Sequence, residues 1–222
     1  MALSQAIINK AKLSIPSIEQ VSIQLLIETF CLVKSEKKYD FDWDEEQFSA
    51  HIISYMDLHC LVSDFHLHID IEKKLLDRTK LPQDKNNPKY LPRIDISIAS
   101  WLFKDNEKLQ YFFEAKNICE NSWNKSKGTR VDAKSYLDRY ISTGIENFRI
   151  GRYYNGAIIG YVLEGSIDNI VSKLNIALSK NSNTSRGIQN LIFSPSYSNL
   201  YNSIHKTTSI EDINIKHVFL KF

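Results

Sequence analysis

The sequence lacks any long apolar run. Across its 222 residues, no hydrophobic stretch approaches the roughly 20 residues that a helix needs to span a bilayer. Residues 1–12 show neither a long apolar stretch nor a cleavage-type pattern, so they do not resemble a secretory signal peptide. We therefore expect a cytoplasmic protein with no membrane partner.

Cysteine is also scarce. The three cysteines, Cys31, Cys60 and Cys119, are odd in number and far apart, and no CxxC pair occurs. Zinc sites and disulfide frameworks need closely patterned or paired cysteines, so neither is indicated. The pattern predicts three reduced thiols that are mostly buried.

A strong net charge is missing as well, because 28 Lys and Arg residues stand against 26 Asp and Glu residues and give +2. The charges are nevertheless segregated. Asp40, Asp42 and residues 44–46 form an acidic run, whereas residues 121–153 hold seven basic and three acidic residues, a local net charge of +4. A basic segment beside an acidic cluster suits an enzyme that holds phosphates and a cation together. Solvated surface faces remain the alternative for either cluster alone.

The chain contains no internal repeat and no low-complexity block, and its length suits one large domain. Apolar spacing, alternation and Pro/Asn-rich segments predict the elements along it. Asp42 or Asp44 is expected to cap the second helix. Helices are expected over residues 17–36, 44–60, 131–149 and 167–178, strands over 66–71, 93–103, 109–118, 156–163, 188–193 and 214–222, and loops over 77–92 and 179–187.

The order of these elements predicts the α/β class, with a central mixed β-sheet flanked by helices. The linker between the second and third strands is short and polar, which favours a β-hairpin. The step from strand 109–118 through helix 131–149 to strand 156–163 is a βαβ crossover, so these two strands are expected to be parallel. We expect residues 1–40 to form a helical extension packed on a core domain of residues 41–222.

The two strands of the hairpin place charged side chains on one face. Because side chains alternate along a strand, Asp95 and Ser97 share one face of the first strand and its isoleucines share the other. By the same rule, Glu114 and Lys116 share one face of the second strand. The isoleucine face and the Tyr/Phe/Ala face are expected to form core, so the remaining face carries Asp95, Glu114 and Lys116 together.

A two-residue turn at Asp105–Asn106 sets the expected register of this hairpin. Asp95 then lies opposite Lys116, and Ser97 opposite Glu114, so the two carboxylates are diagonal neighbours roughly 7–8 Å apart at the backbone. Two carboxylates at this spacing can reach one cation between them. A register shift of one residue would place them on opposite faces.

These residue types suit phosphodiester hydrolysis, which needs an attacking water, charge stabilisation on the phosphoryl oxygens and help for the leaving group. Mg²⁺ typically binds one or two carboxylates and keeps several waters, which it orients and acidifies. A lysine beside it can polarise that water or hold the phosphate. The alternative is a cross-strand ion pair of Asp95 with Lys116 on a solvated face, which leaves Glu114 inside an aromatic run unexplained.

Asp95 followed by Glu114-Ala115-Lys116 resembles the motif of the PD-(D/E)xK nuclease superfamily, which has the restriction-endonuclease-like fold. The resemblance covers roughly residues 43–165, since the following helix and parallel strand also match. It implies a nuclease in which Asp95 and Glu114 are ligands of Mg²⁺ or Mn²⁺ and Lys116 is the catalytic lysine.

Many members of this superfamily add an acidic residue from the preceding helix to the metal site. Glu46 is the candidate for that role here, with Glu45 next. The chain departs from the pattern at Ile94, which stands where the family has a proline.

Basic residues after the catalytic strand are candidates for contacts with backbone phosphates. A solvated loop or a surface ion pair explains them about as well. They are Lys125, Lys127 and Arg130 in a loop, and Lys134 and Arg139 on the following helix. The expected partner is nucleic acid, with DNA preferred to RNA.

Two other functions remain open. One is an inactive nuclease-like domain that binds nucleic acid or a protein partner, and the other is an RNA-directed toxin or defence nuclease with the same active site. A homodimer is an open alternative, with helix 17–36 available as an interface. His66 and His68 share a strand face and are a further candidate for a metal site.

Overall fold

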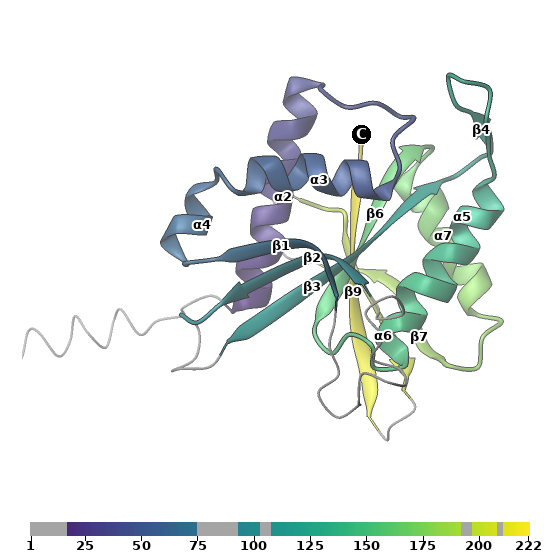
Figure 1. Ribbon diagram of the computed structural model, residues 1–222. Helices are drawn as coiled ribbons and strands as arrows, with labels where there is room; N and C mark the ends of the chain where they lie inside the picture. Colours follow the sequence, from purple (N-terminus) through teal and green to yellow (C-terminus); the bar gives the residue numbers. More distant parts are fainter. Residues whose placement is uncertain (1–16, 75–92, 103–107, 192–196, 208–210) are drawn as a thin grey trace, which may run out of the picture.

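A mixed β-sheet of seven strands forms the centre of the protein, in the order β1–β2–β3–β6–β9–β8–β7 (Figure 1). This computed structural model describes residues 17–74, 93–102, 108–191, 197–207 and 211–222. The sheet and its flanking helices confirm the predicted α/β class. The strands are β1 (His68–Lys74), β2 (Arg93–Ser100), β3 (Leu109–Cys119), β6 (Gly156–Glu164), β7 (Thr184–Asn190), β8 (Leu200–Lys206) and β9 (Asp212–Lys221).

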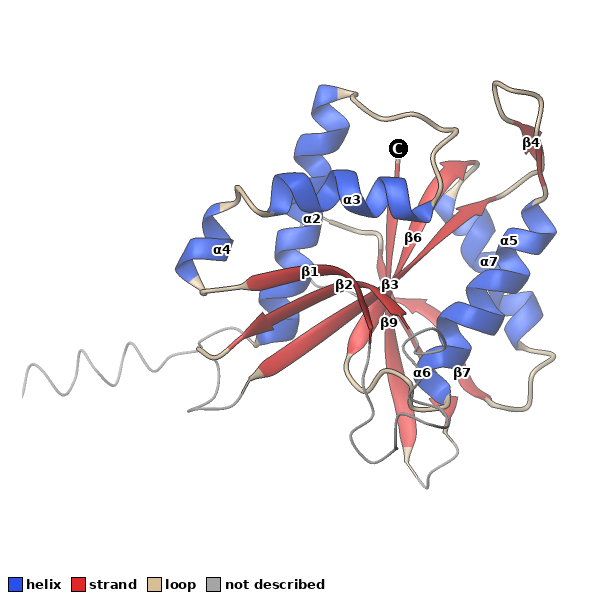
Figure 2. Ribbon diagram, in the orientation of Figure 1, coloured by secondary structure: helices blue, strands red, loops and turns tan. Residues whose placement is uncertain are grey.

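Helices cover both faces of the sheet, and each face has its own apolar core (Figure 2). We call these the α2 face and the α7 face. The α2 face carries α2 (Ile18–Glu36), α3 (Glu45–Met56) and α4 (Cys60–Asp64), and the α7 face carries α5 (Ala133–Arg139), the π-helix η1 (Tyr140–Ile145), α6 (Glu146–Arg149) and α7 (Ile167–Leu178).

Capping boxes start α2 and α3, the two longer of the described helices that precede the sheet. Ser17 Oγ accepts the N–H of Gln20 at the start of α2, and Asp44 Oδ1 accepts the N–H of Gln47 at the start of α3. Asp44 was one of the two predicted caps. Most apolar side chains of α2 are buried in the core of the α2 face, so this helix is part of that core. The division into residues 1–40 and 41–222 stays a prediction.

The predicted crossover is confirmed, because β3 and β6 are parallel neighbours joined through α5, η1 and α6. The expected continuous helix over residues 131–149 is wrong in two respects, since it begins only at Ala133 and its middle is a π-helix. Gly144 lies in this π-helix close to the sheet. A Cβ built on it would lie 3.6 Å from Ile158 Cδ1 and 3.8 Å from Lys116 Cγ, which is ordinary packing.

The register of the β2–β3 hairpin differs from the expected one by two residues. The pairs are Ile96 with Phe113 and Ser97 with Phe112, so continuing the ladder places Asp95 beside Glu114 instead of Lys116. The last pair joins Ser100 to Leu109, so the connection is longer than the assumed two-residue turn. A shift of two residues keeps every side chain on its expected face.

The C-terminal part of the chain was predicted less well. The expected loop 179–187 is wrong at its end, because β7 begins at Thr184. The expected closing strands correspond to β7 and β9, whereas β8 between them was not predicted. The buried face of β8 carries the polar Ser203 and His205, which hide the apolar alternation of a strand. The loop expected over residues 77–92 lies outside the described residues.

Two remaining expectations concern cysteines and membranes. Cys119 is buried as expected, but Cys31 and Cys60 are exposed, because both project from the outer sides of their helices. No helix in the described part of the chain is long and apolar enough to cross a membrane.

Candidate functional site

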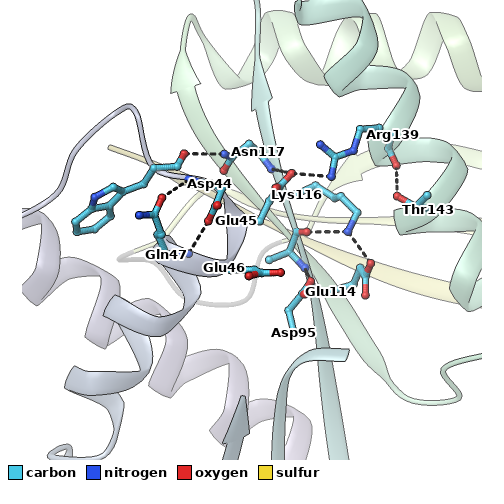
Figure 3. A network of polar contacts seen from close by, with 12 residues as sticks. Asp44, Glu45, Glu46, Gln47, Asp95, Glu114, Lys116, Asn117, Arg139 and Thr143 are labelled. Atoms are coloured by element: carbon cyan, nitrogen blue, oxygen red, sulfur yellow. Dashed lines mark hydrogen bonds and ion pairs between the residues drawn. The ribbon is translucent and has the colours of Figure 1, made fainter. Parts of the chain in front are cut away.

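Asp95, Glu114 and Lys116 meet at the end of the β2–β3 ladder, just beyond its Ile96–Phe113 pair (Figure 3). We call these three residues the carboxylate cluster. On β3, Glu114 and Lys116 alternate with residues of the α2-face core and lie on the α7 face with Phe112 and Ile118. The sequence pattern alone had predicted that the three side chains share one site, and the structure brings them together.

Short hydrogen bonds fix these side chains. Lys116 Nζ donates to Glu114 Oε1 at 2.6 Å and to the carbonyl oxygen of Ala115 at 2.8 Å. Asp95 Oδ2 accepts the backbone N–H of Ala115 at 2.6 Å. The second carboxylate oxygen of Glu114, Oε2, is buried and has no hydrogen-bond partner. Such an orphaned acceptor is uncommon in a folded protein, and a bound cation would satisfy it.

The ion pair of Lys116 lies within its own strand, and its two side chains are only 9% and 7% exposed. The alternative of an Asp95–Lys116 ion pair on a solvated sheet face is therefore not what the structure shows.

β2 bends at Asp95. Ile96 belongs to the core of the α2 face, whereas Ile94, two residues earlier, belongs to the core of the α7 face. On the neighbouring strand, Glu72 stands opposite Asp95 between two regular pairs, and its φ of 50° lies in the left-handed region. Such strained backbone is found mainly where the surrounding structure fixes a functional position.

The electrostatic environment of Asp95 disfavours its charge. Burial raises the pKa of Asp95 to about 6, and the negative charges of Glu114 and, to a smaller extent, Glu45 act in the same direction. The charge of Lys116 and the hydrogen bond from Ala115 oppose this increase. Perturbed carboxylates of this kind cluster at functional sites, because burial and neighbouring charges there tune a pKa to its chemical task.

Two glutamates at the start of α3 were the candidates for a third acidic residue. Glu46, the first choice, forms an ion pair with Arg93 at 3.3 Å, and its side chain is 61% exposed. Glu45 is more enclosed, and its Oε1 accepts the N–H of Asn117, directly after Lys116, at 3.3 Å. Its charge also acts on Asp95, so Glu45 is the better placed of the two.

The donor set determines which metal the site suits. Carboxylate oxygens prefer hard cations such as Mg²⁺, which needs only one or two of them and keeps its waters. Among the described residues, no group of three or more His, Cys, Asp and Glu side chains is arranged to hold a metal ion. Asp95 and Glu114 could supply two of the oxygen ligands of a hydrated Mg²⁺ or Mn²⁺. His66 and His68 likewise form no such group.

The basic residues that the sequence singled out divide into three kinds. Lys125 lies on the small hairpin of β4 (Trp123–Asn124) and β5 (Arg130–Val131), and its Nζ donates to the carbonyl oxygen of Asp42. Lys127, Arg130 and Lys134 are exposed. Arg139 reaches the site, because its Nη2 lies 3.3 Å from Glu45 Oε1. Only Arg139 thus contacts a residue next to the carboxylate cluster.

Two site residues were missed by the sequence analysis. Buried Asn117 ties the start of α3 to β3, since its Nδ2 donates to the carbonyl oxygen of Trp43 at 3.1 Å. Buried Tyr153 donates its hydroxyl to the carbonyl oxygen of Arg93 at 2.8 Å. Burial raises the pKa of Tyr153, and the charges of Glu114 and Asp95 add to this. A polar residue after Lys116 in an apolar strand was a signal for Asn117, whereas Tyr153 had none.

A second buried polar cluster lies on the other side of β6, because Glu114 on β3, Ile158 on β6 and His217 on β9 form one row of the sheet. Tyr140 Oη and His217 Nδ1 share a hydrogen bond of 2.9 Å. Ser203 Oγ then joins His217 Nε2 and His205 Nε2 at 2.7 Å each. We call these four residues the histidine chain. Burial lowers the pKa of His205 to about 4 and that of His217 to about 3.

Comparison with protein-family models, with curated proteins and with solved structures finds no match for this chain. The interpretation of the site therefore rests on its own residues and their geometry.

Proposed function

We propose that the protein is a Mg²⁺- or Mn²⁺-dependent nuclease that hydrolyses phosphodiester bonds in DNA. The observation that carries this proposal is the meeting of Asp95, Glu114 and Lys116 at the end of the β2–β3 ladder, with Glu114 Oε2 buried and unpartnered. The resemblance to the PD-(D/E)xK superfamily supports the same assignment. The antiparallel β2–β3 pair followed by the parallel β6 is the order of elements that this resemblance implies.

Each residue has a role that follows from its position. Asp95 and Glu114 would hold the cation, which would supply a Lewis acid for a phosphoryl oxygen and an acidified water. In hydrolysis, the water oxygen bonds to phosphorus, the bond from phosphorus to one sugar oxygen breaks, and that oxygen takes up a proton. Lys116 has three N–H donors, and two of them are bound to Glu114 and Ala115. The third is left to hold a phosphoryl oxygen or orient the water.

A cleavage assay tests the proposal. Supercoiled plasmid, linear duplex, single-stranded DNA and RNA are incubated with the protein in Mg²⁺, Mn²⁺, Ca²⁺ or EDTA. We expect cleavage of DNA in Mg²⁺ or Mn²⁺, none in EDTA, and a loss of at least about 100-fold in Lys116→Ala. Lys180→Ala is the matched control, because Lys180 is an exposed lysine that follows α7. Cleavage by Lys116→Ala at the wild-type rate would refute the assigned site.

A specific observation favours a second candidate, a nuclease-like domain that binds nucleic acid without cutting it. Both acidic residues of α3 are engaged by arginines, Glu46 by Arg93 and Glu45 by Arg139. If these ion pairs persist, no third carboxylate is available to the cation. Binding of DNA without cleavage in any of the metals would select this candidate, and cleavage of RNA alone would change the substrate class.

A further inference from the structure

The segment between α6 and β6 is pinned to the strand that carries Glu114. Asn155 Nδ2 donates to the carbonyl oxygen of Gln110 at 3.0 Å, and the carbonyl oxygen of Asn155 accepts the N–H of Phe112 at 3.0 Å. Gly156 lies so close that a Cβ on it would stand 2.1 Å from the Phe112 carbonyl oxygen. On the other side, the N–H of Arg152 donates to the carbonyl oxygen of Asn147 at 2.9 Å. The backbone of residues 152–156 therefore has a fixed place beside β3.

Two consecutive tyrosines of this segment have opposite environments. Tyr153 is buried, with its hydroxyl bound to the backbone of Arg93. Tyr154 is 70% exposed, which makes it the most exposed large aromatic side chain in the described part of the chain. Its ring stands edge-on to the buried ring of Phe112, at a centroid distance of 5.3 Å and an angle of 87°. The ring of Tyr154 is therefore exposed to solvent, while its backbone and its contact with Phe112 fix its position. Such a ring can offer an aromatic face to a ligand.

This surface adjoins the carboxylate cluster. Phe112 precedes Glu114 by two positions on the same face of β3, a separation of roughly 7 Å. Glu114 and Asp95 are close enough to Tyr153 to raise its pKa, and the charge of Arg152 lowers it. Arg152, two residues before Tyr154, is also exposed, and its Nη1 donates to Asn147 Oδ1 at 2.9 Å, so the same segment carries a positive charge as well as the ring.

We propose that Tyr154 is a stacking platform for an unpaired base next to the scissile phosphate, and that the substrate is single-stranded nucleic acid. This inference rests on the proposed function, because it names the substrate class of the same site. Bases stack on exposed aromatic rings, and every base has a face that can do so. In a duplex both faces of a base are covered by its neighbours, so only an unpaired nucleotide can use the platform. Arg152 would hold the backbone of that strand by its charge.

Binding is measured in Ca²⁺ by fluorescence anisotropy with a single-stranded oligonucleotide and with the matching duplex. The full-length protein is compared with Tyr154→Ala, Tyr154→Phe and the control Leu58→Ala, which removes an apolar side chain that is 87% exposed. We expect Tyr154→Ala to weaken single-strand binding by roughly tenfold to a hundredfold and duplex binding by at most about twofold. Tyr154→Phe keeps the ring and should stay within about twofold of wild type.

A second arm identifies the stacked base directly. Single-strand oligonucleotides with one abasic position are scanned along the sequence, and one position should abolish the difference between wild type and Tyr154→Ala. The proposal is overturned if Tyr154→Ala binds the single strand like wild type, if both variants lose affinity equally, if the duplex loses as much as the single strand, or if neither oligonucleotide binds. Circular dichroism verifies that each variant is folded.

The two proposals fail in different ways. If the protein prefers single strands in a Tyr154-dependent way but cleaves nothing in Mg²⁺, the nuclease proposal is refuted and the stacking role of Tyr154 is supported. If the protein cleaves in Mg²⁺ and Tyr154→Ala cleaves equally well, the nuclease proposal is supported and the stacking role of Tyr154 is refuted.

Discussion

Two buried polar clusters lie at the α7 face, separated by β6, and they differ in how far their hydrogen bonds are satisfied. In the histidine chain, hydrogen bonds link Tyr140, His217, Ser203 and His205 in sequence, and His205 Nδ1 lies 3.3 Å from Thr184 Oγ1. In the carboxylate cluster, one oxygen of Glu114 has no partner. A satisfied cluster stabilises the fold by itself, whereas an unsatisfied one lowers stability until a ligand completes it.

The same difference sets opposite responses to pH. Neutral imidazoles suit the histidine chain, because each ring has one donor and one acceptor, and protonation would add a donor with no acceptor. The lowered pKa values of His205 and His217 mean that the unfolded chain binds more protons below pH 6.5. The raised pKa of Asp95 means that the folded chain binds the extra proton between about pH 4 and pH 6. Lowering the pH therefore reduces the stability that the histidine chain contributes, and it increases the stability of the carboxylate cluster by protonating Asp95.

The largest expected effect is the loss of stability in acid. From the two histidines alone, the free energy of unfolding should fall by about 4 kcal/mol between pH 7 and pH 5. Protonation of Asp95 should return about 1 kcal/mol over the same interval. Urea unfolding in EDTA at pH 7, 6 and 5 measures the net fall. Equal stability at pH 7 and pH 5 would contradict the neutral, fully satisfied histidine chain.

The next largest effect is expected in Asp95→Asn, which should be more stable than the wild type but less active. The asparagine oxygen can still accept the N–H of Ala115, while the charge that burial and Glu114 disfavour is removed. At pH 7 in EDTA the free energy of unfolding should rise by up to about 3 kcal/mol. Cleavage in Mg²⁺ should fall by at least about 100-fold, because a metal ligand is lost. Asp57→Asn, an exposed aspartate just after α3, is the control.

Asp95→Asn also allows the contribution of the two histidines to the pH dependence of stability to be measured without that of Asp95. Because the variant lacks the titration that offsets them, its stability should fall more steeply than that of the wild type between pH 7 and pH 5. Parallel curves for the two proteins would show that Asp95 does not titrate in this range.

A smaller effect is expected in Tyr140→Phe. The ring still stacks on His217 and Phe219, but His217 Nδ1 loses its buried partner. We expect the free energy of unfolding to fall by about 1–3 kcal/mol. The cleavage rate of the folded protein should change by less than about threefold, because the histidine chain does not reach the carboxylate cluster. A large loss of cleavage without a loss of stability would show that the histidine chain belongs to the site.

The sequence predicted the carboxylate cluster better than the histidine chain, and the reason is physical. Alternation along β3 decides which face Glu114 and Lys116 share, and that needs only local geometry. The expected register was wrong by two residues, yet the faces were preserved. His205 and His217 lie on β8 and β9, and their partner Tyr140 comes from a helix, so their contact depends on tertiary packing. Tyr153 was missed for the same reason.

The helices and strands were likewise predicted well where a local sequence pattern marks them. β6 and α7 were predicted closely because unbroken apolar patterns mark them. The π-helix was not, since a π-helix differs from an α-helix by one inserted residue and has no periodic signal of its own.

The smallest expected effect separates the two clusters most directly, because it uses the cation itself. A ligand that binds only the folded state stabilises it, and at ten times its dissociation constant the gain is about 1.4 kcal/mol. Mg²⁺ should raise the unfolding free energy of the wild type by this amount at pH 7.5, since it supplies the partner that Glu114 Oε2 lacks. Tyr140→Phe should show the same gain, because its altered group lies outside the carboxylate cluster, whereas Asp95→Asn should show almost none. An equal gain in Asp95→Asn would place the cation elsewhere, and no gain in the wild type would mean that the orphaned oxygen is a structural defect and not half of a metal site.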